Sequence, residues 1–305
     1  MGYFSVLFSK GFWLAISLRR AGAALLGAFG ALWLIASILN FFDAPAGRSL
    51  QNHWGLFLAL GLFSALAVNW PRLRTSSQLQ NRDVTIELRV GDMFKMPGAF
   101  VIGAATTFET RIIDGLISPR SVQGQFTGQF YDSDSHLEAD IRTALNGVQP
   151  ERYIWRDNRQ IPVYPIGTVA RVVTRGRRAY FLAYTTLNDN GVAQGTFEDI
   201  KNSLPRLWEF LSTRGDFERI VMPVLGTAFA RMPEPRHVII REIVKSFVAA
   251  CSSLRPTEAL TIVVPYSDYS ANKVDLGELE RYVEHVCKYT EFQTANATGA
   301  GVPLQ

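Results

Sequence analysis

The chain of 305 residues carries 31 basic and 27 acidic side chains, and its hydrophobic content of 48% is ordinary. The charges are unevenly placed: residues 1–82 hold seven of the bases and one of the acids, which leaves 24 bases and 26 acids for the rest of the chain. The larger part is therefore close to neutral, which argues against a globular domain that binds nucleic acid through a basic face. The two cysteines, Cys251 and Cys287, form neither a metal-type pair nor a disulfide framework, which fits a reducing compartment.

Two uncharged apolar runs follow the N-terminal segment 1–20. Residues 21–42 have a length that can cross a bilayer core of roughly 30 Å as a helix. The second run, His53–Trp70, has a tryptophan near each end, as is common at membrane interfaces. The runs predict a transmembrane hairpin over residues 21–70, and two buried helices of a soluble core are the alternative. A cleaved signal peptide would have a single, shorter apolar run.

Basic residues flank the hairpin on one side only. The bases before the first run and after the second are Lys10, Arg19, Arg20, Arg72, Arg74 and Arg82. The connecting turn has only Asp43 against Arg48. The positive-inside rule therefore predicts a multi-pass protein with both termini in the cytoplasm. The segment 1–20 either lies in the membrane interface or extends the first helix.

Beyond a polar stretch predicted to be a linker (71–82), the pattern changes to that of an α/β domain, residues 83–292. Short apolar or alternating runs predict strands, and amphipathic runs predict helices. The predicted strands are Val84–Val90, Ala99–Ala104, Val163–Val173, Ala179–Thr185, Ile220–Val224 and Ala259–Val264. The predicted helices are Asp134–Leu145, Thr196–Leu211, Val238–Leu254 and Asp275–Tyr289.

The alternation of strands and helices indicates a three-layer α/β/α domain with a mixed, largely parallel sheet. An antiparallel pair is expected around the turn at Arg175-Gly176. The small and polar tail, residues 293–305, is predicted to be disordered.

Three segments that follow predicted strands carry the candidate binding residues, because open α/β sheets bind ligands at the carboxyl ends of their strands. Asp92 and Met93 follow the first strand. A predicted glycine turn contributes Ser121, Val122, Gln123, Gly124, Gln125 and Phe126. The loop after Ile220–Val224 contributes Leu225, Gly226, Thr227, Ala228, Phe229 and Ala230. A tight loop between strand and helix can offer backbone N–H groups to a phosphate, although many such turns use glycine for geometry alone.

The order of these segments resembles that of a macro domain, the α/β/α module that binds ADP-ribose, over about residues 84–290. Val90–Met93 resembles the family's Gly-Asp-Ile element, which implies that Asp92 contacts the adenine amino group. Ser121–Phe126 stands where the first phosphate loop runs, and Tyr164–Gly167 resembles the segment before a central strand. Pro223–Phe229 resembles the second phosphate loop, which implies that its aromatic residue packs by the ribose.

A membrane hairpin followed by such a domain further resembles the membrane-anchored macro-domain effectors of the Thoeris bacterial anti-phage system. The resemblance implies an inner-membrane protein whose functional partner is a TIR-domain enzyme. That enzyme would make an ADP-ribose derivative, histidine–ADP-ribose, as the signal. Binding of the signal would drive homo-oligomerisation, membrane disruption and abortive infection.

Several departures from the family pattern favour a sensor without enzymatic activity. Hydrolytic macro domains commonly carry Asn-Ala-Ala-Asn where this chain has Gly103-Ala104-Ala105-Thr106-Thr107. The histidines lack metal-ligand spacing, so we expect no metal. No Ser-His-Asp or Cys-His arrangement can be assembled, so we expect no catalytic residues, and we expect no cofactor. Asp189 and Asn190, in the loop 186–195, are candidates for contacting the distal group of the ligand. A membrane-tethered ADP-ribosyl hydrolase, or a scaffold whose vacant domain docks a partner protein, are the alternatives.

Overall fold

The structure is a computed structural model, and it describes residues 18–42, 53–70, 73–80, 82–112, 116–156, 158–187, 193–226 and 232–290. Most of the predicted interfacial segment 1–20 and all of the predicted disordered tail 293–305 lie outside these ranges. The chain divides into two compact units. One comprises Met1–Leu73 with Tyr266–Asp275, and the other comprises Arg74–Pro265 with Leu276–Gln305.

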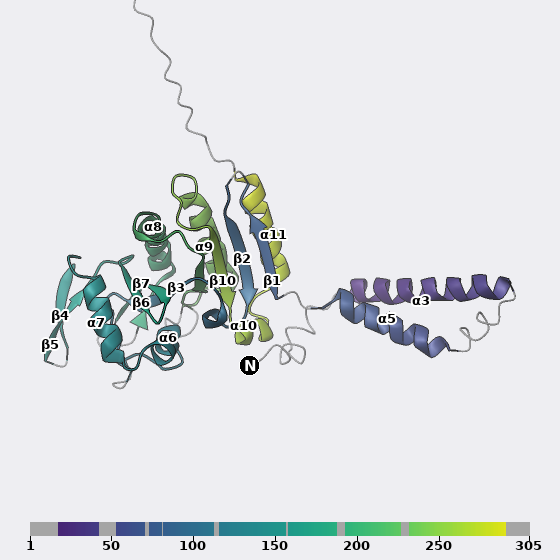
Figure 1. Cartoon of the computed structure of the whole chain (residues 1–305), viewed down its shortest axis with the longest axis horizontal. Helices are drawn as coiled ribbons and strands as arrows, with labels where there is room; N and C mark the ends of the chain where they lie inside the picture. Colours follow the sequence, from purple (N-terminus) through teal and green to yellow (C-terminus); the bar gives the residue numbers. More distant parts are fainter. Residues whose placement is uncertain are drawn as a thin grey trace, which may run out of the picture. The chain divides into compact units, whose positions relative to one another are not determined.

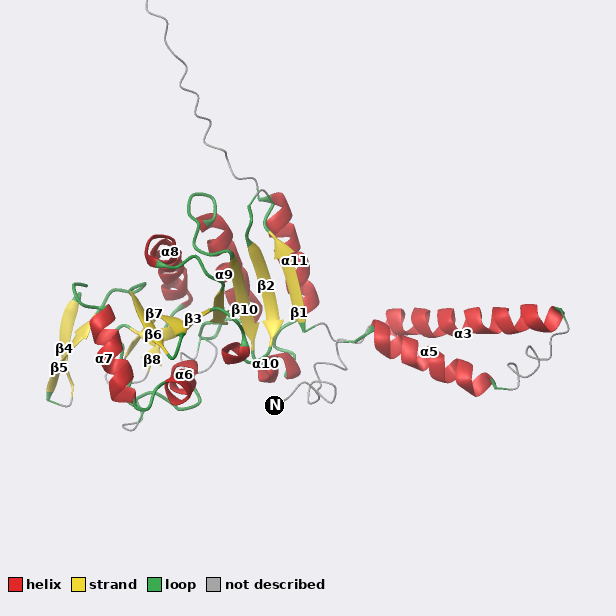
Figure 2. Cartoon of the chain, viewed as in Figure 1, coloured by secondary structure: helices red, strands yellow, loops and turns green. Residues whose placement is uncertain are grey.

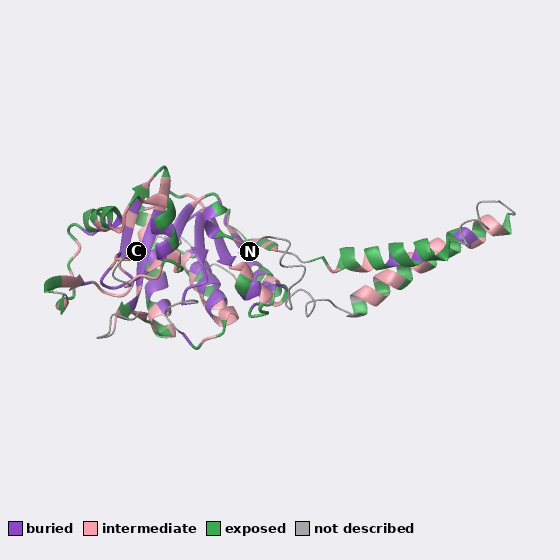
Figure 3. Ribbon diagram, turned by 90° about the horizontal axis from the view of Figure 1, so that it is seen from below, coloured by how far each residue is buried: buried purple, intermediate pink, exposed green. Residues whose placement is uncertain are grey.

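The first unit contains a pair of apolar helices, α3 (Leu18–Phe41) and α5 (Trp54–Val68). The two helices pack on each other through aromatic rings: the ring centroid of Phe57 lies 6.1 Å from that of Phe29 and 6.4 Å from that of Trp33. Most of the remaining helix surface is exposed, as the green colour in Figure 3 shows. This distribution, apolar and exposed, is typical of a helix pair that is covered by something other than its own chain.

Of the described helices, one is long and apolar enough to cross a membrane. It covers Ala21–Phe41, 21 residues with a mean hydropathy of 2.0. Helix α5 has 15 residues, which gives it a length of about 22 Å against a hydrocarbon core of roughly 30 Å. Its end is fixed by Asn69, whose side-chain amide donates to the Ala65 carbonyl oxygen at 2.8 Å. The structure therefore confirms one apolar helix of spanning length and does not establish the predicted second span.

The second unit is an α/β domain built on one mixed sheet with the strand order β1-β2-β10-β9-β3-β7-β6, to which β8 is added beside β7 (Figures 1 and 2). Strands β2, β10, β9, β3 and β7 run parallel. The outer strands β1 and β6 run antiparallel to their neighbours. The strands of this sheet are β1 (Arg74–Gln78), β2 (Thr85–Val90), β3 (Ala99–Ala105), β6 (Val169–Thr174), β7 (Arg177–Leu187), β8 (Ala193–Gln194), β9 (Ile220–Pro223) and β10 (Ala259–Val264). The predicted mixed sheet is thus confirmed.

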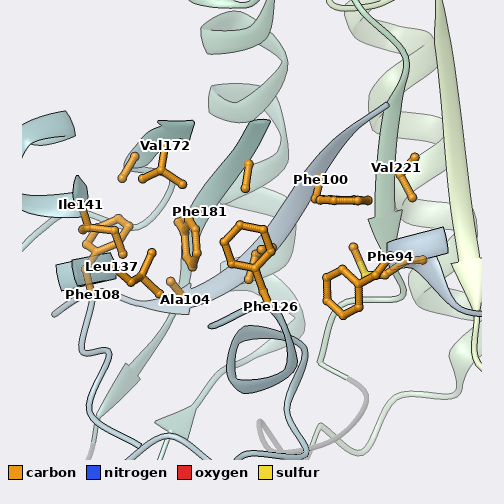
Figure 4. Close-up of a cluster of buried hydrophobic side chains, with 14 of the residues drawn as sticks. Phe94, Phe100, Ala104, Phe108, Phe126, Leu137, Ile141, Val172, Phe181 and Val221 are labelled. Atoms are coloured by element: carbon orange, nitrogen blue, oxygen red, sulfur yellow. The ribbon is translucent and has the colours of Figure 1, made fainter. Parts of the chain in front are cut away.

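Helices cover both faces of this sheet, which is visible in the alternation along β7. Phe181 points into a cluster that includes Phe126 of α6 and Leu137 of α7 (Figure 4). The neighbouring residue Tyr180 points to the opposite face, where its ring lies 6.2 Å from that of Phe210 in α8. The helices of this unit are α6 (Val122–Phe130), α7 (Asp134–Ala144), α8 (Phe197–Arg214), α9 (Arg236–Ala250) and α11 (Leu276–Tyr289), with a short 3₁₀ turn η1 (Met93–Lys95).

The sequence-based boundaries are wrong at two places. The predicted linker 71–82 contains the edge strand β1, whose polar residues alternate between exposed and half-buried positions. An edge strand has one neighbour and exposes more of its side chains, so it lacks the apolar signal of a central strand. The predicted strand Val163–Val173 is interrupted: β5 (Arg159–Val163) forms a separate hairpin with β4 (Arg152–Arg156). The interruption contains Gly167, whose φ of +89° no extended strand adopts.

The predicted turn between β6 and β7 is confirmed. Arg175 and Gly176 have φ values of +47° and +73°, and the flanking strands pair directly from Thr174 with Arg177. Two consecutive positive φ values match the twist of an antiparallel hairpin, which explains the glycine at this position.

Candidate functional site

The carboxyl ends of the parallel strands lie at one edge of the sheet, and the predicted binding segments follow these ends. Asp92 follows β2, and Gly226 follows β9. Ring contacts hold the turn after β2 against helix α6, since the Phe94 centroid lies 6.3 Å from that of Phe126 and 6.0 Å from that of Phe130. The structure therefore brings the first two predicted segments together.

Asp92 and Met93 have different environments. The Asp92 side chain is exposed, and its carboxylate accepts a hydrogen bond from the backbone N–H of Phe94 at 3.1 Å. This bond caps the turn η1 and fixes the carboxylate at the edge of the sheet. The Met93 side chain, in contrast, is buried in the core cluster. Of this predicted pair, only Asp92 has an exposed side chain.

The prediction of a glycine turn over residues 121–126 is wrong, because these residues begin helix α6. Ser121 is the N-cap: its hydroxyl oxygen accepts from the Gly124 N–H at 3.0 Å and donates to the Ser118 carbonyl oxygen at 2.7 Å. A Cβ at Gly124 would collide with the Ser118 carbonyl oxygen. The glycine therefore allows the helix to approach the preceding loop. The sequence analysis had instead assigned this glycine to a turn.

The side chains of this helix start are largely occupied by the protein itself. Gln123 is buried and its amide donates to the Glu109 carbonyl oxygen at 2.6 Å, while the Gln125 amide donates to that of Arg120 at 2.8 Å. Phe126 is fully buried in the core (Figure 4). Val122 packs against the same cluster. What α6 offers a ligand is therefore its backbone N–H groups and the positive end of its dipole.

Gly226 lies in the loop after β9 and has a conformation that favours glycine, with φ of +72°. Its backbone N–H donates to the hydroxyl oxygen of Tyr184 at 3.1 Å. A Cβ at this position would collide with Met232 Sδ, and the preceding residue Leu225 is buried. The remaining predicted residues of this loop, Thr227, Ala228, Phe229 and Ala230, lie outside the described part of the chain.

Tyr184 is the site residue that sequence reasoning missed. It lies at an irregularity in the pairing of β7 with β3, where the register shifts between Ala104 and Ala105. Its ring covers Gly103, where a Cβ would collide with the ring. Burial raises the pKa of the Tyr184 phenol, and the weaker opposing effect of the Gly226 N–H does not offset this. The one sequence signal was an aromatic residue with a polar tip at the end of an otherwise apolar strand.

Met232 links the loop after β9 to the loop that precedes α8. Its side chain is 8% exposed and lies against both Gly226 and Gly195, the residue that follows β8. The predicted loop 186–195 therefore returns to the same edge of the sheet as Gly226. Asp189 and Asn190, the candidates for contacting a distal group, are outside the described residues.

Two further aspects of the described residues bear on chemistry. They contain no group of three or more His, Cys, Asp or Glu that could hold a metal ion. After β3, the Thr106 N–H donates to the Thr185 carbonyl oxygen at 2.8 Å, and the Thr106 carbonyl oxygen accepts from the Tyr164 N–H at 2.8 Å. This segment is thus fixed by backbone bonds to both sides.

Comparison with known proteins places the domain in context. Residues 86–265 match the family model described as "Thoeris protein ThsA, Macro domain". No curated protein matches the chain. Similar solved structures include an Oceanobacillus iheyensis macrodomain mutant with ADPR, at 16% identity and a TM-score of 0.46, covering 68% of this chain and 100% of that one. Another is the macrodomain of the same organism with ADP, at 18% identity and a TM-score of 0.43, covering 68% of this chain and 98% of that one.

Proposed function

Because the chain belongs to the family of Thoeris ThsA macro domains, we propose that its α/β domain binds an ADP-ribose-type nucleotide at the edge formed by β2, β3 and β9. The observation that carries the proposal is the hydrogen bond of 3.1 Å from the Gly226 N–H to the Tyr184 hydroxyl oxygen. A phosphate oxygen can accept from the same N–H. The positive φ of Gly226 holds this donor in a strand-to-loop conformation of the kind that cradles anions.

In this proposal, each of the three segments contacts a different part of the nucleotide. The exposed carboxylate of Asp92 accepts from the adenine amino group, as the resemblance implies. The pyrophosphate lies between Gly226 and the start of α6, where the dipole and the first N–H groups of a helix favour an anion. Since Ser121 already accepts from the Gly124 N–H, the donors that we assign to phosphate on α6 are those of Val122 and Gln123.

The distal group of the ligand sets its specificity in this proposal. The loop 186–195 returns to the edge at Gly195, beside Met232 and Gly226. We infer that this loop distinguishes a modified ADP-ribose, and that histidine–ADP-ribose made by a TIR-domain enzyme is the natural signal.

We further infer that the domain reads the ligand without hydrolysing it. The segment Gly103–Thr107 contains no asparagine that could orient a substrate or a water. The ring of Tyr184 occupies the space above Gly103, so this position has no room for such a side chain. A second reading, in which the domain turns over an ADP-ribosylated substrate, predicts product after prolonged incubation with stoichiometric protein.

In this proposal, the apolar helices α3 and α5 cause the damage to the membrane. We propose that α3 and α5 form a hairpin in the bacterial inner membrane, with both chain termini in the cytoplasm as the flanking bases favour. A ligand shifts an assembly equilibrium only by its preference for the assembled form. We therefore infer that the assembled domains bind the signal more tightly, and that clustering of the hairpins disrupts the membrane and causes abortive infection.

The test is calorimetric titration of the full chain in detergent micelles with ADP-ribose and with histidine–ADP-ribose. We expect binding of both, with the conjugate tighter. Gly226→Ala adds a strain of about 1–2 kcal/mol for a left-handed residue and a collision with Met232. Relief of this strain moves the Gly226 N–H out of its position, so ADP-ribose should bind about tenfold or more weakly, a change of about 1.4 kcal/mol.

Gly176→Ala is the matched control. Gly176 has nearly the same φ, +73°, in the turn between β6 and β7, but an added Cβ there meets nothing within 4 Å. This variant should bind like the unaltered chain. Equal affinities for the two alanine variants, or no binding of either nucleotide to the unaltered chain, would contradict the proposed site.

A further inference from the structure

A cavity of about 320 Å³ lies between the segment after β3, helix α7 and the hairpin β4–β5. None of the residues that we assign to the nucleotide lines it. Its volume lies at the lower end of the range of small-molecule sites. The cavity is therefore a candidate for a second ligand, independent of the nucleotide edge.

One wall of the cavity is apolar and suited to a ring. The rings of Phe108 and Tyr164 lie edge to face with centroids 5.7 Å apart, and both residues line the cavity. Ile141 and Leu145 at the end of α7 extend this wall and are themselves buried. Figure 4 shows Phe108 beside Ile141, where these two elements meet. Such a wall contacts a flat apolar body of about the size of a phenyl ring.

Two buried hydroxyl groups line the same cavity without a hydrogen-bond partner. Thr107 and Thr110 are 8% and 1% exposed, and no described atom lies within hydrogen-bond reach of either Oγ1. A buried hydroxyl without a partner is destabilising, because it has lost its hydrogen bonds to water and gained none. By contrast, the Thr127 hydroxyl, buried in α6 nearby, donates to the Gln123 carbonyl oxygen at 2.9 Å. A polar group of a bound ligand could form hydrogen bonds with the hydroxyl groups of Thr107 and Thr110.

The charges of the cavity favour an anion. Two of its arginines are paired with the two glutamates that line it: Arg111 with Glu109 at 3.1 Å and Arg142 with Glu138 at 2.7 Å. A third arginine, Arg159 on β5, also lines it and makes no ion pair with a described residue. The cavity thus carries one positive charge in excess. A guanidinium pairs with carboxylate or phosphate oxygens through two parallel hydrogen bonds.

The segment after β3, which lines the cavity, is held in a strained backbone conformation. Phe108 has a φ of +49°, a conformation that is strained for a bulky residue. It is held there by its N–H bond to the Ala105 carbonyl oxygen at 2.9 Å and by the bond from the Gln123 amide to the Glu109 carbonyl oxygen at 2.6 Å. The cavity therefore needs little rearrangement to accept a ligand.

We propose that this cavity binds a small anion with an apolar body of about ring size. Its carboxylate or phosphate pairs with Arg159, its ring lies against Phe108 and Tyr164, and its remaining polar atoms bond to the hydroxyl groups of Thr107 and Thr110. The cavity shares no lining residue with the site proposed for the nucleotide, and the proposal does not depend on the function proposed for that site.

The experiment is a ligand-observed NMR titration of the full chain in detergent micelles. The probes are phenylacetate and phenyl phosphate, and phenylacetamide is the uncharged control. We expect saturable binding of at least one anion at or below about 1 mM, a free energy of about 4 kcal/mol, and at least fivefold weaker binding of the amide. The anion that binds more tightly shows whether the site prefers a carboxylate or a phosphate.

Variants locate the site. Arg159→Gln and Thr110→Val should each weaken the preferred probe at least fivefold, whereas Arg152→Gln, at an exposed position of the same hairpin, should not. Thr110→Val removes an unpartnered hydroxyl at nearly constant volume, so its melting temperature should be unchanged or higher. The proposal is overturned if neither anion binds, if the three variants bind alike, or if saturating ADP-ribose displaces the probe.

Discussion

At the scale of single residues, the Tyr184 hydroxyl and a bound phosphate compete for one donor, the Gly226 N–H. Tyr184→Phe removes the competitor and keeps the ring over Gly103. A net hydrogen bond contributes about 1 kcal/mol, so we expect ADP-ribose to bind about fivefold more tightly to this variant. Calorimetry on the full chain measures the change directly.

Tyr180→Phe serves as the control for this prediction. Tyr180 lies on the same strand but faces α8, with its ring 6.2 Å from that of Phe210. Loss of its hydroxyl should leave nucleotide affinity unchanged. If Tyr184→Phe binds more weakly than the unaltered chain, the hydroxyl contacts the ligand instead of competing with it.

At the scale of elements, helix α6 depends on its N-cap. Ser121→Ala removes the acceptor of the Gly124 N–H and the donor to the Ser118 carbonyl oxygen. Loss of a serine N-cap costs about 1 kcal/mol, which for a domain of this size lowers the melting temperature by about 2–4 °C. Ser76→Ala, on the exposed side of the edge strand β1, should leave it unchanged. Equal melting temperatures for the two variants would show that the cap is dispensable.

Two buried thiols, Cys251 directly after α9 and Cys287 in α11, make the stability of the domain depend on pH in the alkaline range. Burial raises the pKa of Cys251 to about 12 and that of Cys287 to about 11. The folded protein therefore keeps both protons above the unfolded pKa of about 8.5, where the unfolded chain loses them. The contribution to the free energy of unfolding is complete below about pH 8.5 and declines as the pH rises toward 11.

A pair of denaturation series tests this dependence. The urea midpoint of the full chain should fall between pH 8.5 and 11, and the double variant Cys251→Ala, Cys287→Ala should show a shallower fall, with tyrosine titration common to both. Iodoacetamide at pH 8 should label the thiols only after unfolding. Parallel pH profiles, or rapid labelling of the folded chain, would show that the thiols are not held protonated by burial.

What sequence reasoning found and missed follows from how each element is stabilised. The central strands β3, β9 and β10 are buried on both faces, so their apolar runs identify them. Strand β1 is polar because it lies at an edge, and α6 starts with Ser-Val-Gln-Gly because a loop approaches Gly124. Neither condition is visible in local composition.

The site shows the same division. Asp92 and Gly226 were predicted because each lies in the loop that follows a strand, and parallel strands bring such loops to one edge of the sheet. Tyr184 was missed because its position depends on a register shift between β3 and β7, which no periodicity reveals. Phe126 was predicted as a ligand contact and lies in the core, since the helix that contains it was not recognised.

At the scale of the whole molecule, the apolar helix α3 predicts how the chain partitions. Leu34, near the middle of this helix, is 61% exposed. An arginine at the centre of a membrane helix costs about 2.5–3.5 kcal/mol. Leu34→Arg should therefore reduce the fraction of the chain in carbonate-washed membranes, and Leu34→Phe should not. Full retention of the arginine variant would mean that residues outside α3 suffice for anchoring.

The contact between Tyr184 and Gly103 also constrains how this chain can evolve. A Cβ at position 103 collides with the Tyr184 ring, so the asparagine that hydrolytic macro domains commonly carry at this place would require the ring to move. The two positions should covary among relatives: glycine with an aromatic residue, or a larger residue 103 with a small residue 184.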